Sequence, residues 1–110
     1  MAVAAGFFSF TVVVGEDGSI FSFGNNEHSQ LGTGDVVLKL TPTRVAGLPA
    51  PVRQVAAGLE HTGMVTEAGD LLMCGHGMQG QLGLGDEDDR TTPTLVPRAA
   101  FDGAAVLMVA

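Results

Sequence analysis

The sequence predicts an all-β fold built from two four-stranded antiparallel sheets. The first observation is an internal repeat: residues 3–6, Val-Ala-Ala-Gly, return 52 residues later at 55–58, and residues 41–43, Thr-Pro-Thr, return 51 residues later at 92–94. The second is that segments with β-branched residues alternate with glycine-containing turns in both copies. The third is that no segment has the 3.6-residue periodicity of an amphipathic helix.

The first two strands of each copy are expected at 3–6 and 10–14, and again at 55–58 and 62–66. The first of each pair contains small residues, and the second contains the β-branched residues that favour a sheet. Asp17-Gly18 in one copy and Gly69 in the other then supply the positive φ of a hairpin turn.

Two further strands complete each copy, at 20–23 and 43–46 and at 71–74 and 94–96, and a proline starts each fourth strand. Four strands make one blade of a β-propeller, in which small residues suit the innermost strand because blades crowd around the axis. The predicted fold class is therefore all-β, two four-stranded antiparallel blades of a β-propeller that are part of a larger closed ring.

The second copy closely resembles the regulator-of-chromosome-condensation repeat. The resemblance rests on Val-Ala-Ala-Gly at 55–58, on His61-Thr62, and on the Gly-Gln-Leu-Gly-Leu-Gly-Asp segment at 80–86. It covers nearly the whole chain and occurs twice. The resemblance implies structural roles for Gly6, Gly24, Gln30, Gly32, Gly58, His61, Gly75, Gln81, Gly83 and Asp86.

The first copy departs from the family pattern at two places. It has Ser9 where the family commonly has histidine, and one extra residue before Gly18 predicts a bulge in its second strand or in the turn that follows. The usual asparagine is Asn26 in the first copy and Gly77 in the second. These substitutions fall at structural positions, so the predicted architecture is unchanged.

The composition argues against several classes of function. A net charge of −7 with five dispersed basic residues disfavours direct nucleic-acid binding. No apolar run is long enough for a membrane span, and the apolar opening has no basic region of a secretory signal. Cys74 is the single cysteine, so no disulfide is expected. An intracellular protein of the cytoplasm or nucleus is expected.

No catalytic, cofactor or metal site is predicted. No nucleophile motif is present, and the glycine clusters at 32–34 and 80–85 lack the lysine and helix of a phosphate loop. His28 and His76 have no zinc spacing, and the acidic run at 86–89 lacks the ligand pattern of a calcium loop. Both histidines are expected to be exposed.

The loops after each third strand are the predicted partner-binding regions, because propellers present contacts on loops. The candidate residues are Glu27, His28, His76, Met78, Gln79, Glu87, Asp88, Asp89 and Arg90. The apolar run at 36–38 is either covered by the next blade or exposed for binding, and burial is favoured.

Two blades alone leave open flanks, and propellers close with about four to eight blades. The predicted division is repeat 1 at 1–54, repeat 2 at 55–108 and the start of a third repeat at 109–110. Further blades are expected from the same parent chain, or alternatively from copies of this one. Members of the family that this sequence resembles typically have seven blades, which favours the parent chain.

The predicted function is a non-catalytic protein–protein interaction module. The alternative implied by the resemblance is guanine-nucleotide exchange on a small GTPase such as Ran, in which a wedge would disturb the nucleotide site. No residue of this sequence matches such a wedge by motif.

Overall fold

The computed structural model describes residues 2–6, 10–77 and 81–104, and of residues 2–6 the backbone alone. The first sheet has the order β1 (Ala2–Gly6), β2 (Phe10–Val14), β3 (Ile20–Gly24) and β4 (Lys39–Arg44). The second has the order β5 (Val52–Ala57), β6 (His61–Thr66), β7 (Leu71–Gly75) and β8 (Arg90–Val96), followed by the 3-10 turn η1 (Arg98–Phe101). All neighbouring strands are antiparallel. The predicted fold class, with four strands in each copy, is confirmed.

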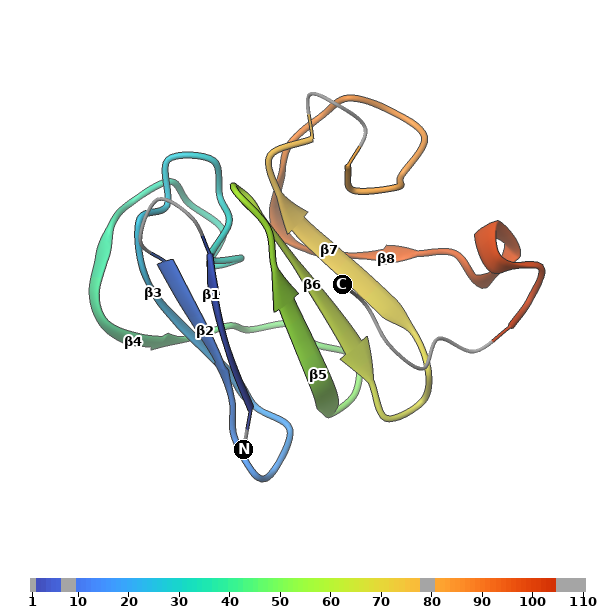
Figure 1. Ribbon diagram of the computed structural model, residues 1–110, viewed down its shortest axis with the longest axis horizontal. Coiled ribbons are helices and arrows are strands. Elements are labelled where there is room, and N and C mark those ends of the chain that lie inside the picture. Colours follow the sequence, from blue (N-terminus) through green and yellow to red (C-terminus); the bar gives the residue numbers. More distant parts are fainter. Residues whose placement is uncertain (1, 7–9, 78–80, 105–110) are drawn as a thin grey trace.

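The two sheets lie side by side as consecutive blades (Figure 1). Strand β5 of the second sheet contacts both β1 and β2 of the first. Strands β4 and β8 form the other edge of their sheets. The small-residue strands therefore lie where the two blades meet, as expected for inner strands of a propeller.

Neither the second strand of the first copy nor the turn after it holds the extra residue, because Val14 lies opposite Ile20 just as Val65 lies opposite Leu71, so the predicted bulge was wrong. Strands β2 and β3 pair without a register shift, and Phe10 lies opposite Gly24 just as His61 lies opposite Gly75. Three residues separate Gly6 from Phe10, whereas two separate Gly58 from His61. The extra residue therefore lies before β2, and Phe10 rather than Ser9 occupies the position equivalent to His61.

The fourth strands start earlier than predicted, at Lys39 and Arg90, so that Pro42 and Pro93 fall inside them. The ladder between the third and fourth strands shifts register in both sheets, between Ser22 and Gly24 and between Met73 and Gly75. A proline cannot donate to a ladder, but an edge strand with an irregular register tolerates it. The two prolines thus lie within the fourth strands, near the register shift, and not at the start of these strands.

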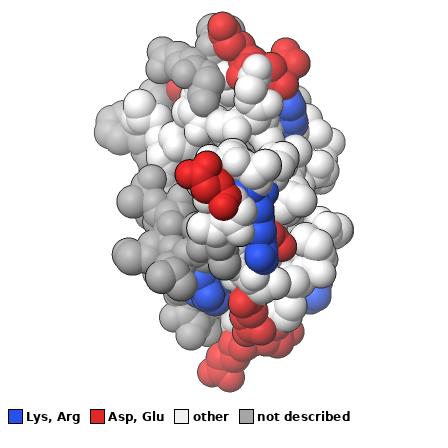
Figure 2. Space-filling view, turned by 90° about the vertical axis from the view of Figure 1, so that its right-hand side faces the viewer, with Lys and Arg blue, Asp and Glu red and all other residues white. Residues whose placement is uncertain are grey.

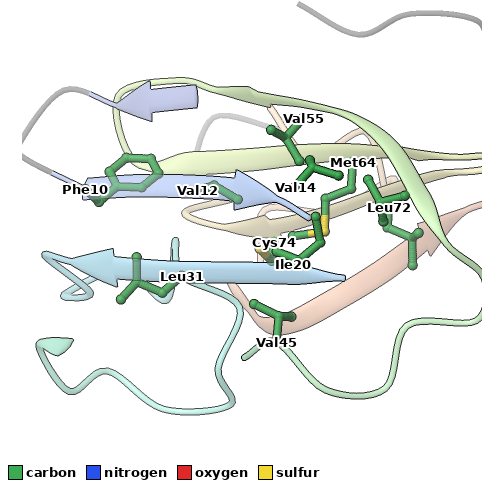
Figure 3. Close-up of a cluster of buried hydrophobic side chains, with 11 residues drawn as sticks. Phe10, Val12, Val14, Ile20, Leu31, Val45, Val55, Met64, Leu72 and Cys74 are labelled. Atoms are coloured by element: carbon green, nitrogen blue, oxygen red, sulfur yellow. The ribbon is translucent and has the colours of Figure 1, made fainter. Parts of the chain in front are cut away.

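The main hydrophobic core lies between the two sheets (Figure 3). Alternate residues of β2 are buried, as period-2 patterning requires for a strand with one face against a partner. The core contains Phe10, Val12, Val14, Ile20, Leu31 and Val45 of the first copy and Val52, Val55, Met64, Leu72 and Cys74 of the second copy. Neither sheet buries this face alone, so the two blades form one packed unit.

Hydrogen bonds also join the two copies. The Val52 N–H donates to the Gly18 carbonyl at 3.0 Å. Gly18 has φ of 82° in the β2–β3 turn, and a Cβ there would lie 2.4 Å from Pro51 Cβ, so only glycine permits this approach. At the opposite end of the blades the Thr62 hydroxyl donates to the Gln30 carbonyl at 2.7 Å. The relative placement of the blades is therefore fixed at both ends.

Candidate interaction surface

Two long loops lie at the same end of the blades (Figure 1). The first, residues 25–38, joins β3 to β4, and the second, residues 76–89, joins β7 to β8. Residues 78–80 of the second loop, including the predicted Met78 and Gln79, lie outside the described residues. Both loops follow the third strand of their sheet, so the repeat places them next to each other.

The first loop is organised around the buried side chain of Asn26. Its Nδ2 lies 3.0 Å from the Asp35 carbonyl and 3.1 Å from the Val37 carbonyl, and its Oδ1 accepts the Leu31 N–H at 3.0 Å. Asp35 also pairs with Lys39 at 2.9 Å. One amide therefore joins the start of the loop to its middle and its end.

The second loop is held differently, because Gly77 stands where the first copy has Asn26. The Gly77 N–H donates to Asp89 Oδ1 at 2.8 Å. A Cβ on Gly77 would lie 2.1 Å from the Asp88 carbonyl oxygen, so no side chain fits. Asp86 pairs with Arg90 at 2.8 Å, in the same way that Asp35 pairs with Lys39.

The predicted acidic contact residues Glu27, Glu87, Asp88 and Asp89 are exposed. Acidic side chains gather at both ends of the view in Figure 2, and the upper end is the level at which Figure 1 shows the loop after β7. Arg90 is partly buried and engaged by Asp86. The Arg90 guanidinium lowers the pKa of Asp86, and the Lys39 ammonium lowers the pKa of Asp35. The end of the second loop is therefore an ordered, acidic surface.

His28 and His76 are not fully exposed, contrary to the prediction. Their rings contact each other in a tilted arrangement with 4.5 Å between centroids, and their side chains are 37% and 19% exposed. Glu60, in the β5–β6 turn, completes the group: its Oε2 lies 2.5 Å from His28 Nε2. Only the packing of one blade against the next brings these residues together, which sequence spacing does not reveal.

The apolar run at 36–38 is exposed, so the predicted burial was wrong. Val36, Val37 and Leu38 have 60%, 58% and 56% of their surface accessible, and Leu40 has 86%. The second blade packs against the face of β2 and β3, whereas this run follows the first loop toward the outer edge strand β4. The run is therefore an exposed apolar segment of the first loop.

Several predicted structural residues lie at the contact between the blades. Gln30 is fully buried, its carbonyl accepts from Thr62, and the Cys74 thiol lies 3.8 Å from the same oxygen. Burial raises the pKa of Cys74 to about 12, so the thiol is not a poised nucleophile.

The His61 ring packs on Gly58, and its pKa is lowered by burial and by the nearby His76. Positive φ angles occur at Gly24, Gly32, Gly75 and Gly83.

The second blade has an apolar pocket on the side away from the first blade. The pocket has a volume of about 360 Å³, and Leu71, Met73, Leu82, Val96 and Phe101 are among its lining residues. Leu71, Leu82 and Val96 are the repeat equivalents of Ile20, Leu31 and Val45, which pack against the second blade. The second blade thus presents the same positions that the first blade uses to bind its neighbour.

Comparison with known proteins identifies the repeat. The family model described as the regulator of chromosome condensation (RCC1) repeat matches residues 17–65 and 68–110, and a related model of the same description matches residues 2–30. The chain belongs to the RCC1 repeat family. Its two sheets are blades of an RCC1-type β-propeller, as the resemblance implied.

Three relatives illustrate this membership. The ultraviolet-B receptor UVR8 of Arabidopsis thaliana is 41% identical over 103 residues, which are 93% of this chain and 23% of that protein. Human WBSCR16 superposes with a TM-score of 0.85 at 27% identity, over 98% of this chain and 28% of that chain. Prp20p of Saccharomyces cerevisiae superposes with a TM-score of 0.79 at 27% identity, over 91% of this chain and 26% of that chain. The chain therefore spans less than a third of each of these relatives.

No helix in the described ranges is long and apolar enough to cross a membrane.

Proposed function

We propose that this chain is a non-catalytic protein-interaction segment of a larger propeller and contacts its partner through the loop surface at 25–38 and 76–89. The observation that supports this most directly is the placement of two loops at one end of a two-blade core, with exposed acidic side chains on the described part of one and an exposed apolar run on the other. Rigid scaffolds that display loops in this way are typical of binding modules.

The test compares two charge-neutralised variants in quantitative affinity capture. The first replaces Glu87, Asp88 and Asp89 by Gln, Asn and Asn, and the matched control replaces Glu16, Asp17 and Glu67 in the turns of the opposite end. We expect the first variant alone to lose a partner that the unmodified chain retains. Equal recovery of every partner by both variants would count against the acidic part of the surface.

A second proposal concerns the ring. We propose that a further RCC1-type blade packs on the pocket lined by Leu71, Leu82 and Val96, because equivalent side chains of the first blade are covered by the second. Substituting Leu71 by Lys would block this packing while leaving the contact between the two described blades intact. In the full-length protein we expect loss of the intact ring, measured as faster proteolysis after residue 97, whereas unchanged proteolysis argues against the proposal.

Guanine-nucleotide exchange is the alternative function. It is favoured by the similarity to Prp20p, whose structure is described together with its binding properties to Gsp1p and histones. The rate of release of a fluorescent guanine nucleotide from purified Ran, measured with and without the protein, tests it. An unchanged rate removes this alternative and leaves the interaction proposal standing.

A further inference from the structure

His28, Glu60 and His76 form a group of potential metal ligands at the junction of the two blades. One ligand atom from each of the three lies within 4.8 Å of the other two. His28 belongs to the first blade, whereas Glu60 and His76 belong to the second. A fourth group, Asp89 Oδ1, lies 3.2 Å from His76 Nδ1.

Backbone hydrogen bonds fix the three residues in place. The His76 N–H donates to the Glu60 carbonyl at 2.8 Å, which holds these two residues side by side. The His28 N–H donates to Gln30 Oε1 at 2.9 Å, and the Gln30 carbonyl accepts from Thr62 of the second blade. The contacts between blades therefore determine how close His28 lies to the other two.

Two polar atoms of the group also lack a hydrogen-bond partner in the described part of the chain. These atoms, Glu60 Oε2 and His76 Nδ1, are buried, and their close ionisable neighbours are His28 Nε2 at 2.5 Å and Asp89 Oδ1 at 3.2 Å. Buried polar atoms without a hydrogen bond are costly unless a ligand engages them. A pocket of about 120 Å³, lined by Asn25, Glu27, His28, Gln30 and Glu60, adjoins the group.

We propose that His28, Glu60 and His76 bind a divalent transition-metal ion, Zn²⁺ or one of similar ligand preference, and that the ion clamps the two blades together. Two imidazoles and one carboxylate are a donor set that suits zinc and not the oxygen-preferring Mg²⁺ or Ca²⁺. Tetrahedral ligands about 2.0 Å from zinc are roughly 3.3 Å apart, so the His28–Glu60 contact has to open slightly. The adjoining pocket provides room for a water as the fourth ligand.

Isothermal titration of the metal-free chain with ZnCl₂ tests the proposal, with MgCl₂ as the comparison ion. We expect one zinc per chain and no magnesium binding. We expect His28→Gln and His76→Gln each to weaken zinc binding by at least about tenfold. The matched control is Asp88→Asn, an exposed acidic residue outside the group, which should leave the affinity unchanged. Zinc binding that persists in the double histidine variant, or that is lost in Asp88→Asn, would assign the ion to the acidic loop and overturn the proposal.

Two measurements on the unmodified chain keep the test independent of how well the variants fold. X-ray absorption at the zinc edge should show two imidazoles in the first coordination sphere, whereas an all-oxygen sphere contradicts the site. Because the ligands come from both blades, zinc at about a hundredfold excess over its Kd should raise the Tm by roughly 10 °C. The absence of any rise would show that the ion does not clamp the blades.

Discussion

Asn26 and Gly77 occupy equivalent positions but hold their loops by different means. The Asn26 side chain reaches the Val37 carbonyl at 3.1 Å. In the second loop the Asp88 carbonyl, the equivalent of Val37, occupies the space that a side chain on Gly77 would need. The backbone itself thus closes the second loop where a side chain closes the first, and neither residue can replace the other without rebuilding the loop.

Replacing Asn26 by Ala should destabilise the chain by about 2–3 kcal/mol, because the buried Leu31 N–H and the carbonyls of Asp35 and Val37 lose their partner. Urea unfolding followed by circular dichroism measures the change in free energy. Asn25→Ala is the matched control: Asn25 is only partly buried and accepts a single bond, from the exposed Glu27 N–H. Equal losses in the two variants would contradict the organising role of Asn26.

At the scale of the strand, the local sequence pattern was sufficient to predict most of the fold. Alternating β-branched residues and positive-φ glycines predicted the second and third strands almost to the residue, because these features act over a few neighbouring positions. The placement of the extra residue of the first copy was not predictable in this way. Several alignments of the first copy on the second are equally good locally, and only the pairing of Phe10 with Gly24 decides between them.

The matched ion pairs Asp35–Lys39 and Asp86–Arg90 should make the ordering of both loops depend on pH. Each pair lowers the pKa of its aspartate below the ordinary value of 3.8. A lowered pKa in the folded chain gives a stabilisation that is complete above the unfolded pKa and is lost as the pH falls through the folded value. The difference in Tm between the unmodified chain and Asp86→Asn should therefore shrink as the pH falls below 3.8.

Thermal unfolding of both proteins between pH 7 and pH 2.5 provides this measurement, and Asp102→Asn serves as the control at an exposed position. A difference that grows as the pH falls would show that the pair does not support the loop.

At the scale of the whole molecule, the stability resides in the contact between the blades. Met64 is 1% exposed and belongs to the core shared by both sheets. Met64→Ala should cost about 2–5 kcal/mol in the free energy of unfolding, because it leaves a cavity that neither sheet can fill alone. Leu95→Ala removes a side chain that is 49% exposed, and its cost should stay within about 1 kcal/mol.

Chemical denaturation monitored by two probes, circular dichroism and the alkylation of Cys74, distinguishes joint from separate unfolding of the blades. The buried thiol reacts only when the shared core opens. Coincident transitions are expected, whereas early alkylation with the strand signal intact would mean that each blade folds separately.

The same scale explains why the exposed position of the loops was predictable and the histidine group was not. The repeat places equivalent loops at one end, so Glu27 and the acidic residues at 87–89 follow from sequence alone. The approach of His28 to Glu60 and His76 depends on the rotation between two sheets, which no local pattern encodes. Exposure of the run at 36–38 depends on which face of the first blade the second blade covers, and that too is a property of the packed pair.

The covered face of the first blade and the pocket of the second are equivalent surfaces, and this has a consequence for assembly. When units bind head to tail, each added unit covers the binding surface of its neighbour and exposes an equivalent surface of its own. The affinity of one contact therefore does not limit how many units are added. Whether such a series closes into a ring or continues as an open filament depends on the angle between successive units. Contacts such as those of Gly18 with Pro51 and of Thr62 with Gln30, which set the angle between the two described blades, therefore bear on which of the two forms results.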